Sequence, residues 1–291
     1  MGFDDLPRQP PPLHPEAGAY AEKALELARE AAARTRHVMD IAYADEARHR
    51  LDVYLPEDQS LSGLPTLIFL HGGRWRAGCK EWNALLAPSL VGFPAILVSP
   101  SYGLSPDHRF PTPLHDVLRS VAWTYRHIAE FGGAPNRLFI GGHSAGGHLA
   151  ALAVTRRELH ARYGLPDDVF KACFPMSGTM NFDFDQVLPG SEEEQIRGIL
   201  LADEEDAVAA SPLRHVEGNK TPFYLSFGEK DFPRVMATNR EMIAALDDQA
   251  GACRWHRFAS LGHFDVHLGL QDPGNPWFEV VGSMMKASAG H

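Results

Sequence analysis

The chain of 291 residues has few cysteines, no basic segment and no long apolar run. The three cysteines, Cys79, Cys173 and Cys253, are an odd set without the spacing of a disulfide framework. We therefore expect free thiols in a reducing compartment. Residues 1–5 carry acids where a signal peptide needs basic residues and an apolar stretch, which favours the cytoplasm. No segment approaches the roughly 20 apolar residues of a membrane span, so no membrane partner is expected.

The charge balance excludes further classes of function. The formal net charge is −10, and no basic cluster offsets it, which opposes binding to nucleic acid or to an anionic membrane. The sequence also lacks a His-Glu-x-x-His motif and clustered Cys/His spacing, so neither a metal site nor another cofactor is expected. A chain of this length can form one α/β domain with a small insertion, burying about three quarters of its unfolded surface.

The most informative motif is Gly-His-Ser-Ala-Gly at residues 142–146, which matches Gly-x-Ser-x-Gly. An apolar, strand-like run precedes it at 138–141, and a helix-forming run follows at 149–154. In this context the motif forms a tight strand-to-helix turn that exposes the serine hydroxyl at the end of a sheet. The two glycines suit the turn because side chains there would collide with neighbouring backbone. The pattern predicts that Ser144 is a nucleophile.

A second motif, His-Gly-Gly-Arg-Trp at residues 71–75, directly follows the apolar strand candidate 66–70. Acyl transfer places negative charge on the carbonyl oxygen, and this charge needs hydrogen-bond donors already in position. Backbone N–H groups of a glycine loop serve well because no side chain blocks their approach. We therefore expect Gly72 and Gly73 to contribute to an oxyanion hole.

A serine nucleophile needs a base, and the base needs an orienting acid. The strand candidate 222–227 runs into Gly-Glu-Lys-Asp, which places Asp231 on a loop just past a strand end. Asp231 is the predicted acid. Glu229 is its competitor, and we interpret it as a solvated charge beside Lys230.

The predicted base is His263, which follows a glycine at a loop-to-helix junction after the strand candidate 254–258. His267 lies one helical turn further on and is the alternative base. The histidines that flank the two motifs are interpreted as packing or hydrogen-bonding residues: His71, His143 and His148.

Together these motifs resemble the α/β-hydrolase group that contains the hormone-sensitive-lipase-like esterases and the kynurenine (aryl) formamidases. The similarity covers roughly residues 45–285. The segments that carry it are His-Gly-Gly-Arg-Trp with Gly78 and Lys80, Ser-Tyr-Gly-Leu-Ser-Pro at 101–106, Gly-His-Ser-Ala-Gly-Gly-His-Leu-Ala at 142–150 and Gly-His-Phe at 262–264. The resemblance implies the triad Ser144, Asp231 and His263, and it adds the N–H of Ala145 to the oxyanion hole.

The two branches of this group differ in their loops. The esterase branch usually has a third glycine after His-Gly-Gly, whereas the form with tryptophan, as at Trp75, is typical of formamidases. The stretch 106–111, Pro-Asp-His-Arg-Phe-Pro, resembles the esterase branch instead. Trp75, Tyr102 and Phe264 are the predicted substrate-binding residues.

The predicted fold is a doubly wound, mostly parallel sheet with a small helical cap. Residues 1–36 are expected to form a proline-rich arm (1–16) and an amphipathic helix (19–36), and residues 37–291 the hydrolase domain. The acidic segment at about 178–219 breaks the strand–helix alternation and is the predicted cap. Strands are expected at 37–43, 50–55, 66–70, 94–99, 137–141, 170–176, 222–227 and 253–258. Helices are expected near 80–91, 113–130, 146–158, 233–248 and 276–286.

We therefore predict a serine hydrolase that cleaves small carboxylic esters through an acyl-enzyme. The alternative is an arylformamidase, and a third possibility is a non-catalytic binding protein on a hydrolase fold. The expected partner is a small ester or formamide. A homodimer is possible, although no residue pattern argues for it.

Overall fold

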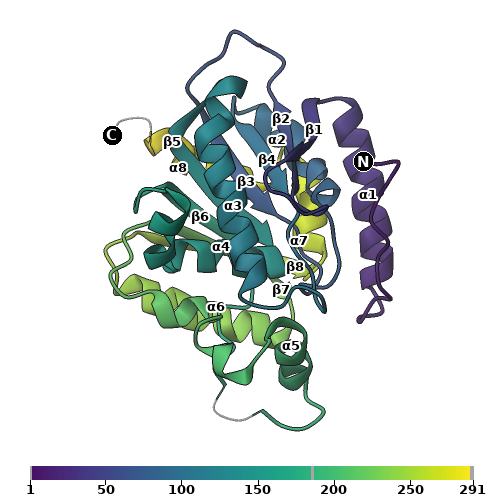
Figure 1. The fold of residues 1–291 in the computed structure, drawn as a ribbon, viewed down its shortest axis with the longest axis vertical. Helices are drawn as coiled ribbons and strands as arrows, with labels where there is room; N and C mark the ends of the chain where they lie inside the picture. Colours follow the sequence, from purple (N-terminus) through teal and green to yellow (C-terminus); the bar gives the residue numbers. More distant parts are fainter. Residues whose placement is uncertain (1, 185–186, 289–291) are drawn as a thin grey trace.

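Within residues 2–184 and 187–288, which the computed structural model describes, eight strands form one mixed sheet (Figure 1). Their order is β1-β2-β4-β3-β5-β6-β7-β8. β1 and β2 pair antiparallel with each other, as do β2 and β4, and every pairing from β4 to β8 is parallel. The bounds are β1 Arg36–Ala42, β2 Arg50–Leu55, β3 Leu64–Leu70, β4 Ile96–Pro100, β5 Gly133–His143, β6 Phe170–Met176, β7 Phe223–Lys230 and β8 Cys253–Gly262. The mostly parallel sheet predicted from the sequence is confirmed.

Helices cover both faces of this sheet, which explains why all seven residues of β3 are buried. The α-helices are α1 Ala17–Ala33, α2 Ala87–Val91, α3 Thr112–His127, α4 Ala145–Thr155, α5 Glu192–Leu200, α6 Pro233–Asp247, α7 Asp265–Leu268 and α8 Pro276–Ala287. Short 3₁₀ helices are η1 Lys80–Leu86, η2 Ile128–Phe131, η3 Arg157–Tyr163, η4 Glu204–Ala207, η5 Pro212–His215 and η6 Gly269–Gln271. Apolar residues of α3, α4 and α6 pack into one core, and those of α1, α2 and α8 pack into the other.

The helix expected near 80–91 has a different form, because it begins with the 3₁₀ helix η1 before α2 continues it. All residues of η1 are buried. The amide of Asn83 donates to the carbonyl of Phe69 at 2.9 Å and to the hydroxyl of Ser99 at 2.9 Å. These bonds tie the segment to the ends of β3 and β4.

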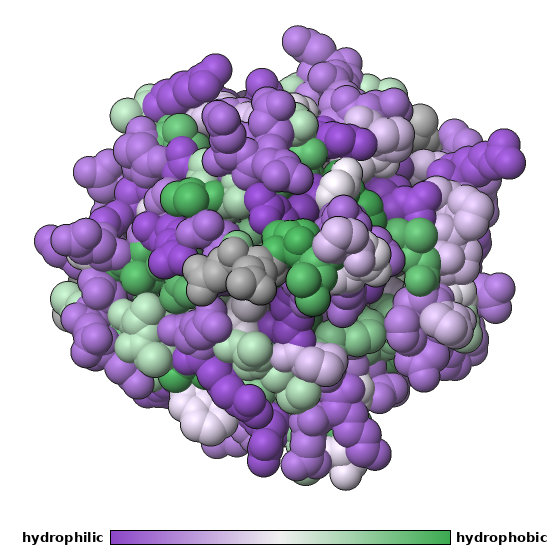
Figure 2. Space-filling view, turned by 90° about the horizontal axis from the view of Figure 1, so that it is seen from below, coloured by the Kyte–Doolittle hydropathy of each residue, from purple (hydrophilic) through white to green (hydrophobic). Residues whose placement is uncertain are grey.

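The segment 178–219 contains α5, η4 and η5, and we call it the cap; its residues 185 and 186 lie outside the described part of the chain. Ser191 caps α5 by accepting a hydrogen bond from the Glu194 N–H, and three glutamates occupy the first turn, where the helix dipole favours negative charge. Ile196 and Leu200 are buried. The cap lies with α6 at one end of the molecule (Figure 1), and hydrophilic residues dominate this end, with apolar residues in small groups between them (Figure 2).

The N-terminal arm, residues 2–16, and α1 lie against the sheet and its helices rather than apart from them (Figure 1). Tyr20, Ala24 and Ala28 of α1 belong to one of the two cores. No helix in the described portion is both long and apolar enough to cross a membrane.

Candidate active site

Ser144 lies at the turn between β5 and α4, with a positive φ of +55° and ψ of −118°. This conformation is strained for a residue with a side chain, and the surrounding packing maintains it. The Ser144 N–H donates to the carbonyl of Met176 at 2.8 Å. A Cβ at Gly146 would lie 2.1 Å from the carbonyl oxygen of Leu70, and one at Gly142 would lie 2.5 Å from Gly146. Both glycines are therefore required by close backbone approach, as the motif predicted.

The structure brings together Ser144 and the two partners predicted for it. Nε2 of His263 lies 2.9 Å from Oγ of Ser144, and Nδ1 of His263 lies 2.7 Å from Oδ1 of Asp231. Asp231 directly follows β7, and His263 directly follows β8. These distances are those of hydrogen bonds between a nucleophile, a base and an orienting acid.

The Asp231 carboxylate is buried and accepts several further hydrogen bonds. Its Oδ1 accepts from the Phe232 N–H at 2.8 Å, and its Oδ2 accepts from the Gly228 N–H at 3.3 Å and from the hydroxyl of Ser177. These bonds fix the carboxylate in the orientation that faces His263. Glu229, the competing acid, is exposed and instead accepts the Ser260 N–H at 2.9 Å.

The glycine loop, residues 71–75, packs directly beside the serine. A Cβ at Gly72 would lie 3.2 Å from Cβ of Ser144, and one at Gly73, where φ is +117°, would lie 2.1 Å from the carbonyl oxygen of Ala77. Ala145 is the first residue of α4, where backbone N–H groups have no partner within the helix. The backbone of the glycine loop and the first turn of α4 therefore both lie next to Ser144.

Two of the predicted substrate-binding rings lie in the core. The Trp75 indole is 3% exposed, donates through Nε1 to Nδ1 of His148 at 3.1 Å, and packs edge-on against Phe182. Tyr102 is completely buried, stacks on His71 with ring centroids 4.4 Å apart, and donates to the His71 carbonyl at 2.7 Å. Both side chains brace the glycine loop, and neither lines the cavity described next.

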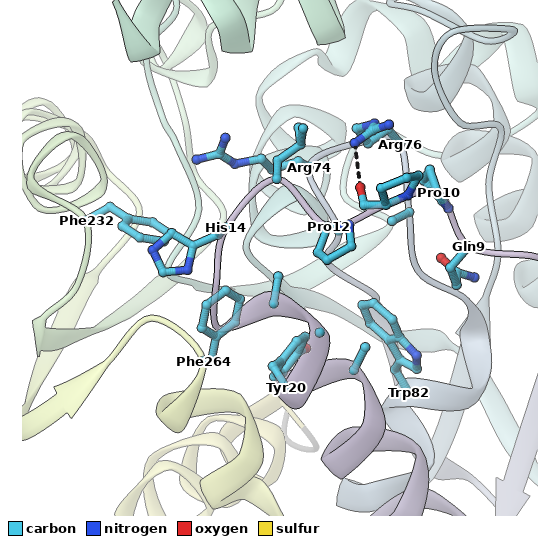
Figure 3. Close-up of a pocket in the computed structure, with 17 residues that line it drawn as sticks. Gln9, Pro10, Pro12, His14, Tyr20, Arg74, Arg76, Trp82, Phe232 and Phe264 are labelled. Carbon is cyan, nitrogen blue, oxygen red and sulfur yellow. Dashed lines mark hydrogen bonds between the residues drawn. The ribbon is translucent and has the colours of Figure 1, made fainter.

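A cavity of about 170 Å³ lies between the N-terminal arm and the glycine loop (Figure 3). Phe264, the third predicted substrate-binding residue, lines it. The full lining is Gln9, Pro10, Pro11, Pro12, Leu13, His14, Ala17, Gly18, Tyr20, Ala21, Gly73, Arg74, Arg76, Ala77, Trp82, Phe232 and Phe264. Most of these side chains are apolar, so the cavity fits an uncharged group.

The arm is tethered to the segment that follows the glycine loop. Oε1 of Gln9 accepts the Gly78 N–H at 2.7 Å, and the Arg76 guanidinium donates to the Pro11 carbonyl at 3.0 Å (Figure 3). The His14 ring contacts Phe232, with centroids 5.2 Å apart, and the Phe232 ring in turn lies 4.4 Å from that of His263. The sequence did not predict that the arm forms one wall of the cavity, because proline content predicts an extended arm but not the surface on which it packs.

Several contacts join the cap to the site. Oε1 of Glu192 lies 2.8 Å from Nη2 of Arg74 and 3.5 Å from Nη2 of the largely buried Arg234. Nε2 of His148 donates to the Ala210 carbonyl at 2.7 Å. The cap is thus bonded to the glycine loop, to α6 and to α4.

Buried imidazoles surround the serine, and burial lowers their pKa values. Desolvation lowers the pKa of His71 to about 3, that of His148 to about 4 and that of His267 to about 3. It also lowers the pKa of His143 well below its ordinary value. These four rings are neutral near pH 7 and act as fixed hydrogen-bonding groups.

The sheet, the serine turn after β5 and the adjacent glycine loop define an esterase-type α/β-hydrolase. Residues 51–244 match the model of the BD-FAE family, and the chain belongs to that family of α/β-hydrolase esterases. The resemblance drawn from the motifs is thereby confirmed.

Relatives occur in both branches that the motifs suggested. Esterase LipQ of Mycobacterium tuberculosis is 32% identical over 73% of this chain and 53% of its own length. The isoprenylcysteine alpha-carbonyl methylesterase ICME of Arabidopsis thaliana is 34% identical over 80% of this chain and 57% of its own length. The kynurenine formamidase of Danio rerio is 27% identical over 82% of this chain and 78% of its own length. The chain spans about half the length of the first curated relatives that it matches.

Solved structures agree in fold. The esterase from the archaeon Pyrobaculum calidifontis superposes with a TM-score of 0.76 over 97% of this chain and 94% of that one, at 20% identity. The carboxylesterase EstE1, from a metagenomic library, gives a TM-score of 0.73 at 22% identity over 93% of this chain and 94% of that one. At these identities the likeness supports the fold alone.

Proposed function

We propose that this chain hydrolyses small carboxylic esters through an acyl-enzyme on Ser144. One observation carries the proposal: an unbroken hydrogen-bonded series from the Ser144 hydroxyl through His263 to Asp231, located beside the glycine loop. A binding protein on this fold would have no need for such a series.

In the proposed reaction Ser144 attacks the ester carbonyl while His263 accepts its proton at Nε2. Asp231 holds the His263 tautomer that has its proton on Nδ1 and stabilises the imidazolium that forms. The N–H groups of Gly72, Gly73 and Ala145 donate to the developing oxyanion. His263 then protonates the departing alcohol, and a water molecule, activated by the same imidazole, releases the acid.

The cavity under the N-terminal arm is the proposed site for the uncharged part of the substrate. Phe264 and Phe232 form one wall, and Pro12 lies across from them (Figure 3). Arg74 and Arg76 also line the cavity, but their guanidinium groups bond to Glu192 and to the Pro11 carbonyl. This arrangement supports a neutral ester with an aromatic or other apolar substituent.

Aryl formamide hydrolysis is the second candidate. Trp75 follows the two glycines as in the formamidase branch, and the formamidase relative aligns over more of its own length than LipQ or ICME does. We also propose a reducing, cytoplasmic location, which is consistent with the three free cysteines.

The test compares the wild type with Ser144→Ala on nitrophenyl esters of increasing acyl length and on an N-formyl aryl amine. Loss of the nucleophile is expected to lower kcat about 10⁶-fold. The protein should stay folded, and an organophosphate should label the wild type at Ser144. Ser60→Ala, which removes an exposed hydroxyl, is the control and should keep full activity. Full activity in Ser144→Ala would refute the proposal, and the preferred substrate decides between ester and formamide.

A further inference from the structure

The hydroxyl of Tyr20 lies between two buried imidazoles behind the triad. Its oxygen is 2.9 Å from Nδ1 of His267 and 3.4 Å from Nδ1 of His143. Nε2 of His143 in turn lies 2.8 Å from the backbone carbonyl oxygen of His263. Tyr20 belongs to α1, whereas His143 ends β5, His263 follows β8 and His267 lies in α7. The folded chain therefore brings a residue of the N-terminal helix to the loop that holds His263.

The protons of this series can be assigned from its acceptors. The carbonyl oxygen of His263 can only accept, so the neutral His143 ring carries its proton on Nε2 and offers a bare Nδ1. The Tyr20 O–H then donates to that nitrogen. His267 donates from Nδ1 to the Tyr20 oxygen. Its Nε2 then carries no proton, so this buried atom, which has no partner among the described residues, is an acceptor and not a donor. Every donor then has an acceptor, and all three bonds run toward His263.

Ring contacts bring the members of this series together, and the hydrogen bonds set their orientation. The Tyr20 ring meets Phe264 with centroids 4.8 Å apart and meets Trp82 edge-on at 5.4 Å. The rings of His143 and His267 stack at 4.9 Å. His143 also contacts the glycine loop, because a Cβ at Gly72 would lie 3.1 Å from its Nδ1. His143 therefore touches the loop of the oxyanion donors and the loop of the base at once.

We propose that Tyr20 is a positioning residue for catalysis: through its hydroxyl it fixes the His143 ring, and His143 fixes the backbone of His263 so that the imidazole stays in line with Ser144. The N-terminal helix is on this view part of the catalytic apparatus. The proposal rests on the proposed esterase function for its kinetic consequences and on geometry alone for its hydrogen bonds.

The first test is Tyr20→Phe, which removes only the hydroxyl and keeps the packed ring. Because misplacement of a catalytic group lowers the rate of both acylation and deacylation, kcat on 4-nitrophenyl acetate should fall about tenfold while KM changes less than twofold. Tyr43→Phe is the matched control, since Tyr43 is also buried and its hydroxyl donates to the Ser101 carbonyl at 2.6 Å. It should lower the melting temperature to a similar extent and leave kcat within twofold. Equal effects of the two variants on kcat, or an unchanged kcat in Tyr20→Phe, would overturn the proposal.

The second test asks whether Tyr20 acts through His143. His143→Gln keeps a side-chain N–H that can reach the His263 carbonyl but removes the Nδ1 acceptor. Adding Tyr20→Phe to His143→Gln should then change kcat less than twofold. A further tenfold loss in the double variant would show that Tyr20 acts by another route and would reject the proposed series.

Nitrogen-15 NMR of the histidine rings tests the hydrogen bonds without any substrate. The wild type should show His143 protonated on Nε2 and His267 on Nδ1, and Tyr20→Phe should shift the Nδ1 resonance of His143. The opposite tautomer of His143 would refute the series. If the protein hydrolyses neither esters nor formamides but shows these tautomers, the proposed function is refuted, while the hydrogen-bonded series from His267 to His263 stands.

Discussion

Arg74 and Glu192 join the glycine loop to the cap, with Nη2 of Arg74 2.8 Å from Oε1 of Glu192. Arg74 immediately follows Gly73, and Glu192 is the first residue of α5. Arg74 also has a positive φ of +53°, which is strained for a residue with a side chain and is held by the surrounding contacts. Cap position and loop geometry are therefore linked at this pair.

We predict that Glu192→Gln lowers kcat/KM about two- to fivefold at low salt, because partly exposed ion pairs contribute about 0.2–1 kcal/mol. Glu193→Gln removes the same charge from the next position of the helix and serves as the control, with a smaller effect. The difference should vanish at about 1 M salt, where the Debye length is roughly 3 Å. Steady-state kinetics at two salt concentrations measure this difference in kcat/KM. Equal losses of kcat/KM in both variants would argue against a specific link between Arg74 and Glu192.

The orienting acid can be tested by a pair of isosteric changes. Asp231→Asn is expected to lower kcat about 10⁴-fold, because an amide favours the wrong His263 tautomer. Glu229→Gln should stay within a few-fold of the wild type, since the Glu229 carboxylate faces Arg257 and the Ser260 N–H at the surface. Circular dichroism controls for folding. If the larger loss occurred in Glu229→Gln, the acid would have been misassigned.

The cavity wall can be tested at His14, whose ring contacts both Phe232 and Phe264. His14→Ala should raise KM a few-fold for phenyl acetate, because part of the aromatic wall is lost, with aromatic contacts contributing about 0.5–1.5 kcal/mol. Methyl acetate, which is too small to reach this wall, is the matched control substrate and should be unaffected. A pH-stat assay measures the hydrolysis of both esters. An equal rise in KM for the two esters would place the substrate elsewhere.

Stability should fall below pH 6.5, because the buried histidines are neutral in the folded chain. With folded pKa values of about 3 for His71 and His267 and about 4 for His148, the unfolded chain binds more protons between pH 6.5 and 4, so unfolding becomes more favourable as pH falls. Asp52 opposes this trend, since burial raises its pKa to about 6 and its protonation favours the folded state. His143, whose pKa also lies well below its ordinary value, adds to the loss, so four histidines outweigh one carboxyl and the free energy of unfolding falls as the pH drops below 6. Urea unfolding at pH 7, 6 and 5 checks this, and a constant free energy of unfolding would contradict it.

The sequence predicted the sheet and the site with different success. The strands were predictable because buried parallel strands are mostly apolar runs, as at 170–176, where only the partly exposed Lys171 interrupts the run and the predicted and observed bounds agree. The residues that meet at Ser144 could be predicted from the sequence for a related reason. The carboxyl ends of parallel strands lie at one edge of the sheet, so the loops that follow β5, β7 and β8 converge there.

The orientation of side chains was not predictable in the same way. Trp75 was expected to face the substrate, but it lies in the core because His148 and Phe182, distant in sequence, provide a hydrogen-bond acceptor and an aromatic surface for its indole. The place of the proline-rich arm was likewise not predictable, since its contacts include a guanidinium, a backbone N–H and two rings from three separate segments. Such long-range pairings leave no local pattern.

The proposed triad spans from the middle of the sheet to its margin. Ser144 follows β5, which has neighbours on both sides, whereas His263 follows β8, the last strand in the order. Outer strands open more readily than inner ones, because fewer contacts must break. Gentle heating should therefore dissociate the base from the nucleophile while most of the molecule is still intact. Inactivation would then precede the calorimetric transition and be reversible on cooling, and amide exchange in 253–262 would exceed that in 133–143.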